Sequence, residues 1–169
     1  MDALAKALDA LADFRRVAER GGISRRGLFQ PAYDDGERLL ARVVHAAVRR
    51  VSVDAVGGDG TLTNEGTVYV TDRRARLVGN FGRVRREWRW ADLPEVSVMR
   101  GFGGVRLIDD LDAVECDAIL HVANPKFVLD TTSFDAAIGL LRIEAAWVLG
   151  TGRDYDEWLA DLPRRTEGG

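Results

Sequence analysis

The stretch that decides the fold runs from Gly66 to Met99 and reads GTVYVTDRRARLVGNFGRVRREWRWADLPEVSVM. Between Thr67 and Thr71, valines alternate with threonine and tyrosine, which is the period-2 pattern of a β-strand. Asp72 starts a turn, because an aspartate side chain can hydrogen-bond the backbone just after it. A second strand follows at Leu77 and Val78. Gly79–Gly82 then forms a four-residue hairpin loop, with residues that tolerate positive φ.

The second half of the stretch predicts two more strands. The third strand runs from Val84 to Trp90 and places Trp88 and Trp90 on one face. The fourth covers Leu93–Met99, again with valines on one side. Two tryptophans on one face predict a core position, whereas exposed tryptophans would mark an interface.

The runs GTVYVTDRRARLVG (66–79) and REWRWADLPEVSV (86–98) resemble the central hairpins of bacterial pleckstrin-homology-like (GRAM-type) domains. In that family a strand ends in Thr-Asp/Asn-Arg-Arg, and a later strand carries a Trp before a short acidic and apolar entry to the next. Ala75 departs from the pattern, which usually has a larger apolar residue there. The resemblance covers about residues 36–149. It implies an α+β fold: a barrel of about seven antiparallel strands, in two near-orthogonal sheets, capped by a C-terminal helix.

The chain divides into four segments, and the first is a helix. Leu4, Leu8 and Leu11 recur at helical spacing, and Gly21-Gly22 ends the pattern. We expect this helix to pack on the domain or on a second copy. A membrane-surface helix is the alternative, opposed by aspartates on the polar side, where such helices carry lysine and arginine. The segments are 1–22, the N-terminal amphipathic helix; 23–35, a connector; 36–150, the pleckstrin-homology-like domain; and 151–169, a short C-terminal helix and tail.

The domain begins with a segment that two patterns fit. Gly36–Val43 resembles the Gly-Glu-x-Leu-x-Ala first strand of the same family, while the valine spacing leaves a helix over residues 37–47 open. We prefer the strand because of the resemblance. Further strands are expected at 61–63, 105–108, 118–122 and 127–129, a long helix at 133–149, and a final helix from Asp154 to Leu162 that ends at Pro163.

Charge is distributed unevenly along the chain. The net charge is −3, so no general attraction to nucleic acid is expected. Residues 67–108 hold nine arginines against four acids, a net of +5, which leaves −8 for the rest. The single cysteine, Cys116, excludes an internal disulfide, and the sequence has neither a signal-peptide pattern nor an apolar run long enough to span a bilayer. We therefore expect a cytoplasmic protein.

No motif predicts catalysis, a cofactor or a metal. The glycine-rich loops at 57–60 and 101–104 lie between strands and lack the helix and Gly-Lys-Ser/Thr of a phosphate loop. The acidic residues at 109–115 lack EF-hand spacing and read as a solvated loop. His45, His121 and Cys116 are too few for a structural zinc site, and no serine lies in a nucleophile elbow. We expect no enzyme, no cofactor and no metal.

The arginines of the two hairpins are the candidate binding residues. They are Arg73, Arg74, Arg76, Arg83, Arg85, Arg86 and Arg89. Three interpretations stay open: a solvated or salt-bridged sheet face, a surface for a protein partner, and a site for anionic lipid or nucleic acid. The preferred function is a non-catalytic binding or scaffolding module for a protein partner or a second copy of itself. A peripheral membrane adaptor that binds lipid headgroups through these arginines is the alternative, and a small-ligand barrel or enzyme is the third.

Overall fold

The computed structural model describes residues 3–27, 30–51, 62–98, 104–108, 117–122 and 133–167. It is an α+β fold with antiparallel strand pairing and C-terminal helices, as the sequence predicts. The elements are α1 (Ala3–Glu19), β1 (Leu39–Val51), β2 (Leu62–Thr71), β3 (Arg74–Val78), the 3-10 turn η1 (Asn80–Gly82), β4 (Val84–Arg89), the 3-10 turn η2 (Trp90–Asp92), β5 (Glu95–Val98), β6 (Val105–Ile108), β7 (Asp117–Val122), α2 (Ser133–Gly150) and α3 (Tyr155–Glu167).

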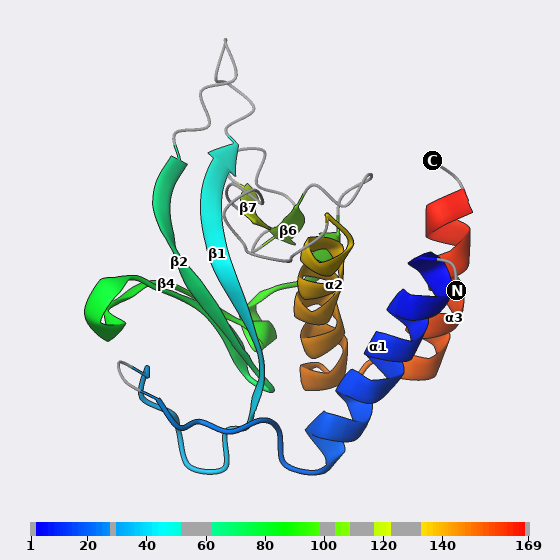
Figure 1. Ribbon diagram of the computed structural model, residues 1–169, viewed down its shortest axis with the longest axis horizontal. Helices are drawn as coiled ribbons and strands as arrows, with labels where there is room; N and C mark the ends of the chain where they lie inside the picture. The colour runs from blue at the N-terminus through cyan, green and yellow to red at the C-terminus, as the bar shows by residue number, and fades with distance from the viewer. Residues whose placement is uncertain are drawn as a thin grey trace.

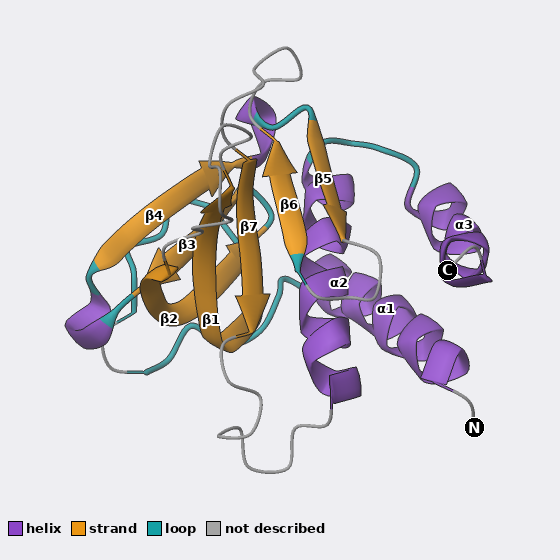
Figure 2. Ribbon diagram, turned by 90° about the horizontal axis from the view of Figure 1, so that it is seen from above, coloured by secondary structure: helices purple, strands orange, loops and turns teal. Residues whose placement is uncertain are grey.

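The described strands form one antiparallel sheet in the order β4-β3-β2-β1-β7-β6-β5. The long strand β1 joins the two halves. Its early residues pair with β2, the residues from Ala46 to Arg49 pair with both β2 and β7, and the last two pair with β7. The order is linear: β4 and β5 are its two ends, and they do not pair with each other within the described residues. The sheet is strongly curved (Figure 2), but it is hydrogen-bonded as a single sheet rather than as the two separate sheets of the expected barrel.

The helices cover the sheet in two layers. Helix α2 packs against β1, β5 and β6, and α1 and α3 pack against α2 from the other side (Figure 1). Helix α1 is held by its own chain, since the hydroxyl of Tyr155 on α3 donates a 2.6 Å hydrogen bond to the carbonyl of Leu11 on α1. The N-terminal helix therefore packs on its own domain, which is one of the two arrangements expected from the sequence; the other was packing on a second copy.

The core lies between the sheet and α2 and contains the residues that the alternation selects. Val68 and Val70 are completely buried, and Trp88 and Trp90 are 7% and 1% exposed, which confirms their predicted core position. Ala75 is directly opposite Trp88 across the β3–β4 pair and is also fully buried. A small residue at position 75 thus faces the bulky indole of the neighbouring strand.

The structure decides or corrects three of the predicted elements. Residues 39–51 form a strand, so the helix alternative for 37–47 is wrong. The short strand expected at 61–63 is the start of one long strand, β2, that continues to Thr71. The last helix does not end at Pro163 but continues to Glu167. The buried side chain of Leu162 and the anchored side chain of Arg165 hold this last turn against the core.

Several expectations fall on residues outside the described ranges. These are the glycine-rich loop at 57–60, most of that at 101–104, the acidic loop at 109–115 with Cys116, and the strand at 127–129. The strand expected at 105–108 is present as β6, and that at 118–122 as β7.

Candidate functional site

The connector, which in the structure extends to the start of β1 and is described at residues 23–27 and 30–38, packs on the outer face of β1, β2 and β3. Leu39, Tyr69 and Val78 form a small buried cluster on this face, and Ile23 and Tyr33 of the connector pack against it. The outer face of an antiparallel sheet is commonly wet. Here the described residues of the connector lie against it, so part of the face on which the sequence places the arginines is shielded from water.

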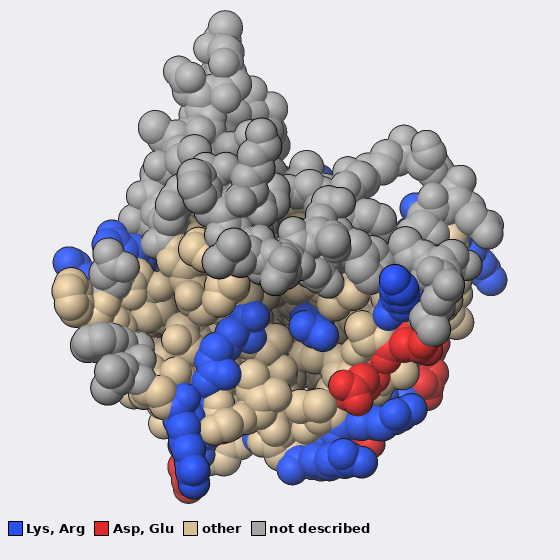
Figure 3. All heavy atoms as spheres, in the orientation of Figure 1, with Lys and Arg blue, Asp and Glu red and all other residues tan. Residues whose placement is uncertain are grey.

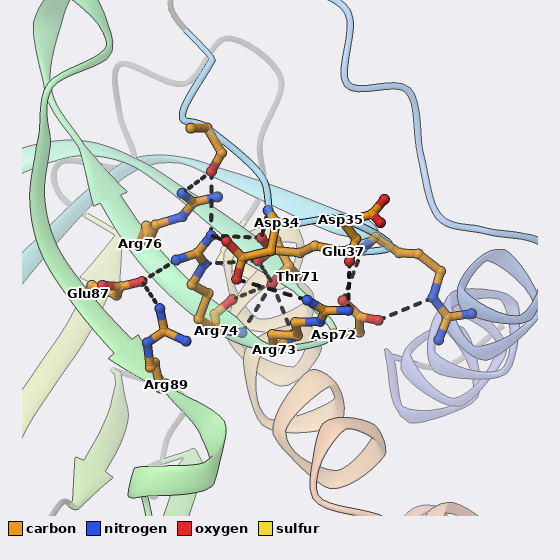
Figure 4. A network of polar contacts seen from close by, with 12 residues as sticks. Asp34, Asp35, Glu37, Thr71, Asp72, Arg73, Arg74, Arg76, Glu87 and Arg89 are labelled. Carbon is orange, nitrogen blue, oxygen red and sulfur yellow. Dashed lines mark hydrogen bonds and ion pairs between the residues drawn. The ribbon is translucent and has the colours of Figure 1, made fainter.

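A buried carboxylate organises the arginines at the β2–β3 turn. Glu37 is 2% exposed and accepts two hydrogen bonds from Arg74, of 2.7 Å from Nη2 and 2.9 Å from Nε. The hydroxyl of Thr71 and the backbone N–H of Asp34 also donate to Glu37, at 2.7 and 2.9 Å. Figure 4 shows Glu37 and Asp34 on one side of the Arg74 guanidinium and Glu87 on the other. We call Asp34, Glu37, Thr71, Arg74, Arg76 and Glu87 the root network.

The root network fixes the charge states of its main pair. Burial by itself would raise the pKa of Glu37, but the hydrogen bonds from Arg74 and Thr71 outweigh it and lower the pKa from 4.5 to about 2. The hydrogen bond to Glu37, followed by that to Glu87, raises the pKa of Arg74. Arg74 is 7% exposed, and Glu87 lies 2.6 Å from its Nη1. The carboxylates of Glu37 and Glu87 neutralise the charge of Arg74, so Arg74 is not available to bind an anionic ligand.

Arg76 is buried with little compensation. It is 4% exposed, donates from Nη1 to the carbonyl of Ala32, and stacks on Tyr33 with 5.2 Å between the guanidinium carbon and the ring centroid. Its Nε and Nη2 atoms are buried and have no hydrogen-bond partner among the described residues. Burial, followed by the charge of Arg74, lowers the pKa of Arg76. Burying the Arg76 guanidinium therefore lowers the stability of the fold, and packing on Tyr33 offsets only part of that loss.

Arg73 lies at the exposed margin of the root network. Its Nη2 donates a 2.9 Å hydrogen bond to the carbonyl of Asp35, and its Nη1 is 3.9 Å from a carboxylate oxygen of Asp34. Its side chain is 45% exposed, so these interactions contribute little to stability. The acidic turn of the connector therefore sits against Arg73 and Arg74, whereas Arg76 contacts the two residues just before that turn.

The β3–β4 hairpin presents the remaining arginines differently. Phe81 is 83% exposed and adopts φ 64°, in the left-handed region that an aromatic residue rarely occupies. We call Phe81, Arg83, Val84 and Arg85 the hairpin tip; all four are exposed. In Figure 3, basic side chains lie at the edge of the molecule where this hairpin projects in Figure 1. Arg89 is exposed on β4, and Arg86 is partly buried, 5.3 Å from the ring centroid of Trp88.

The seven candidate arginines thus form two groups. Arg73, Arg74 and Arg76 meet carboxylates and carbonyls of the segment before β1. In the second group, Arg83, Arg85 and Arg89 are exposed, with Arg89 3.9 Å from Glu87, and Arg86 is half-buried against Trp88. Sequence reasoning missed Glu37 and Phe81. A glutamate between glycine and arginine at a strand start carries no local sign of burial. The exposure of Phe81 could have been predicted from the sequence, because a short hairpin loop bounded by glycines has no core in which a phenylalanine ring can be buried.

A cleft lies between α2 and α3, away from the hairpins. It encloses about 610 Å³ and is lined by Trp147 and Trp158 with acidic residues at its margin. The guanidinium of Arg153 stacks 4.0 Å from the ring centroid of Trp147 and fills part of this space. The described residues contain no group of three or more His, Cys, Asp or Glu side chains placed to hold a metal ion.

Among the described residues, no helix has the length and hydrophobicity to cross a membrane.

Comparison with known proteins adds one likeness. A scan against protein-family models and a search of curated proteins found no match. A search of solved structures found a similarity to the "Vps36 N-terminal PH domain", at 14% sequence identity and a TM-score of 0.44, covering 69% of this chain and 90% of that one. A TM-score of this size does not by itself assign a fold.

Proposed function

We propose that the chain is a pleckstrin-homology-like domain that serves as a cytoplasmic, non-catalytic binding module for a protein partner. Two observations support the fold assignment. The strand order β4-β3-β2-β1-β7-β6-β5, followed by a helix packed against the sheet, is the order of strands and helix that such a domain has. The strand and turn chemistry of residues 66–98 resembles the same family.

The observation that carries the binding proposal is the exposure of Phe81 at the hairpin tip. A large aromatic side chain that is 83% exposed buries its surface only when another molecule covers it. The αL backbone at Phe81 costs about 1 kcal/mol for a residue with a Cβ. Glycine or asparagine would avoid that cost. Arg83 and Arg85 follow Phe81 closely in the sequence, and aromatic residues and arginine are the types enriched in protein interfaces.

The arrangement of the arginines favours a protein over a lipid headgroup. A headgroup site needs several cations that converge on one anion. In this chain Arg74 is balanced by Glu37 and Glu87, and Arg76 is buried beneath the connector. The exposed arginines lie in sequence along the turn and β4, which suits an extended acidic surface better than a compact phosphate.

The test compares two anionic probes on one charge-reversal variant. Purified protein is passed over immobilised poly-glutamate and is also sedimented with phosphatidylserine vesicles, at low and at physiological salt. We expect retention on poly-glutamate that weakens with salt, and loss of retention when Arg83→Glu and Arg85→Glu are combined. The matched control combines Arg20→Glu and Arg164→Glu, which make the same change of net charge at exposed positions on the helical side.

Each other outcome is informative. Retention on vesicles alone, lost in the Arg83/Arg85 variant, would replace the protein-binding proposal with a membrane adaptor. Equal losses in the two double variants would mean that only net charge matters, and the hairpin tip would no longer be the binding surface.

A further inference from the structure

The two ends of the sheet are treated differently by the rest of the fold. At one end, the outer edge of β5 is occupied, because the backbone N–H of Val98 donates a 2.6 Å hydrogen bond to Glu144 of α2. The carbonyl of Val98 also accepts a 3.2 Å hydrogen bond from Arg165 of α3. At the other end, β4 is the last strand in the order, and no element of the described chain pairs with its outer edge. An unpaired strand edge is a template for a further strand.

The hydrogen-bond register shows which groups β4 directs outward. The N–H of Trp90 donates to the carbonyl of Arg73, at 3.0 Å, one step beyond the pair Arg74–Arg89. Hydrogen-bonded and non-hydrogen-bonded pairs alternate along an antiparallel ladder. The pair Arg74–Arg89 is therefore non-hydrogen-bonded, and so is the pair that Glu87 forms two residues earlier. The backbone N–H and C=O groups of Glu87 and Arg89 point away from β3, toward the open edge.

The side chains along this edge define the charge of a matching strand. Arg83, Arg85 and Arg89 are exposed. The carboxylate of Glu87 lies 2.6 Å from Arg74 and 3.9 Å from Arg89, so its negative charge is neutralised by two arginines and the edge keeps a positive balance. Cross-strand neighbours interact directly, and like charges that face each other are destabilising. Pairing of β4 with the β4 of a second copy would set arginines against arginines. The edge is complementary to a strand that carries glutamate or aspartate.

We infer that β4 is a docking site for an extended acidic segment of a partner protein, which adds to the sheet as an eighth strand. The inference rests on the proposed binding function and specifies how that function is performed. The backbone of Glu87 and Arg89 supplies hydrogen bonds to the added strand. Arg89 and, beyond the β-bulge at Arg85, the arginines of the hairpin tip select acidic side chains, and Phe81 covers the end of the segment nearest the hairpin tip.

Arg89 offers a pair of substitutions whose comparison isolates the backbone donor. Its φ of −84° is close to the value that proline requires, and its N–H points outward, so Arg89→Pro breaks no hydrogen bond of the sheet. Arg89→Gln removes the same charge and keeps the N–H. Comparing the two variants separates strand addition from attraction by charge. Thermal unfolding of both checks that the fold is retained.

The probe is a fluorescent peptide of about eight residues that alternates glutamate with valine, the period that places one side-chain type on each face of a strand. We expect Arg89→Gln to weaken binding about threefold and Arg89→Pro to weaken it about tenfold further, measured by fluorescence anisotropy. A peptide of the same length and charge, with prolines in place of its valines, should bind weakly to wild type and show no difference between the two variants.

Two results would overturn the inference in distinguishable ways. Equal affinities for the Gln and Pro variants, with loss in the Arg83/Arg85 double variant, would retain the proposed function and reject strand addition. No binding of the peptide to wild type, with retention on phosphatidylserine vesicles, would reject both and favour the membrane adaptor.

Discussion

At the scale of single residues, Arg74 and Arg76 show that neighbouring arginines can have opposite energetic roles. They are two positions apart on β3, so both project from the outer face. Arg74 has carboxylates on both sides, while Arg76 has two unpartnered guanidinium nitrogens. Removing one partner from a buried ion pair leaves the other charge uncompensated, but replacing an unpaired buried cation by an apolar side chain removes a desolvation cost.

These roles predict opposite effects on stability. Arg74→Met should lower the free energy of unfolding by about 3–5 kcal/mol, because Glu37 then stays buried without its guanidinium. Arg76→Met should leave it unchanged or raise it by about 1 kcal/mol, since methionine keeps the packing on Tyr33. Urea unfolding of the two variants measures both. A loss at Arg76 as large as that at Arg74 would contradict the assignment of Arg76 as an uncompensated cation.

Glu37 predicts how stability depends on pH. Its pKa is lowered from 4.5 to about 2, so in acid the unfolded chain binds a proton that the folded chain does not. This contribution, about 3 kcal/mol, is fully present above about pH 5 and is lost as the pH falls toward 2. Chemical unfolding at a series of acidic pH values should show the decline. In Glu37→Gln the stability at neutral pH is lower and this part of the decline is absent, so an unchanged slope would refute the assignment.

At the scale of elements, the β3–β4 hairpin combines a strained backbone with an exposed aromatic ring. Phe81 has φ 64°, and asparagine adopts that conformation at lower cost. Phe81→Asn should therefore raise the free energy of unfolding by up to about 1 kcal/mol and weaken binding to acidic partners. Thermal unfolding and peptide binding measured on the same sample test this trade-off. A variant that is less stable would mean that the ring packs on the fold rather than serving a partner.

Much of the element pattern is predictable because it is local. Alternation within Thr67–Thr71 produces β2, and the two glycines after α1 end that helix. Only glycine fits at position 22, because its φ is 91° and an added Cβ would lie 2.2 Å from the carbonyl oxygen of Leu39. The continuation of α3 through Pro163 was not predictable in the same way. It depends on Arg165 reaching Glu144, which is 21 positions earlier in the chain.

At the scale of the whole molecule, Glu144 joins three elements that are distant in sequence. It is 2% exposed on α2 and binds the N–H of Val98 on β5, the indole N–H of Trp158 on α3, and the guanidinium of Arg165. The hydrogen bond to Glu144 raises the pKa of Arg165. One carboxylate thus attaches the last helix to the core and covers one end of the sheet.

This arrangement predicts a regional effect of one substitution. Arg165→Met should lower the free energy of unfolding by about 1–3 kcal/mol, less than for a fully buried pair because the Arg165 side chain is 33% exposed. Hydrogen exchange should become faster in α3 and β5 while β2 and β3 stay protected. Arg164→Met, on the exposed side of the same turn, is the matched control. Uniformly faster hydrogen exchange across the chain would show that the contacts of Glu144 do not act locally on α3 and β5.

Local features of the sequence predict the α+β class, most strand and helix positions, the burial of Trp88 and Trp90, and the concentration of arginine in two hairpins. These follow from periodicity, turn chemistry and composition, which act over a few residues. Only the tertiary structure decided which arginines remain exposed. That outcome depends on the connector folding across the sheet, so that Glu37 meets Arg74 from 37 positions away. Long-range pairing of this kind leaves no periodic trace in the sequence, because it is set by the path of the chain and not by local conformational preference.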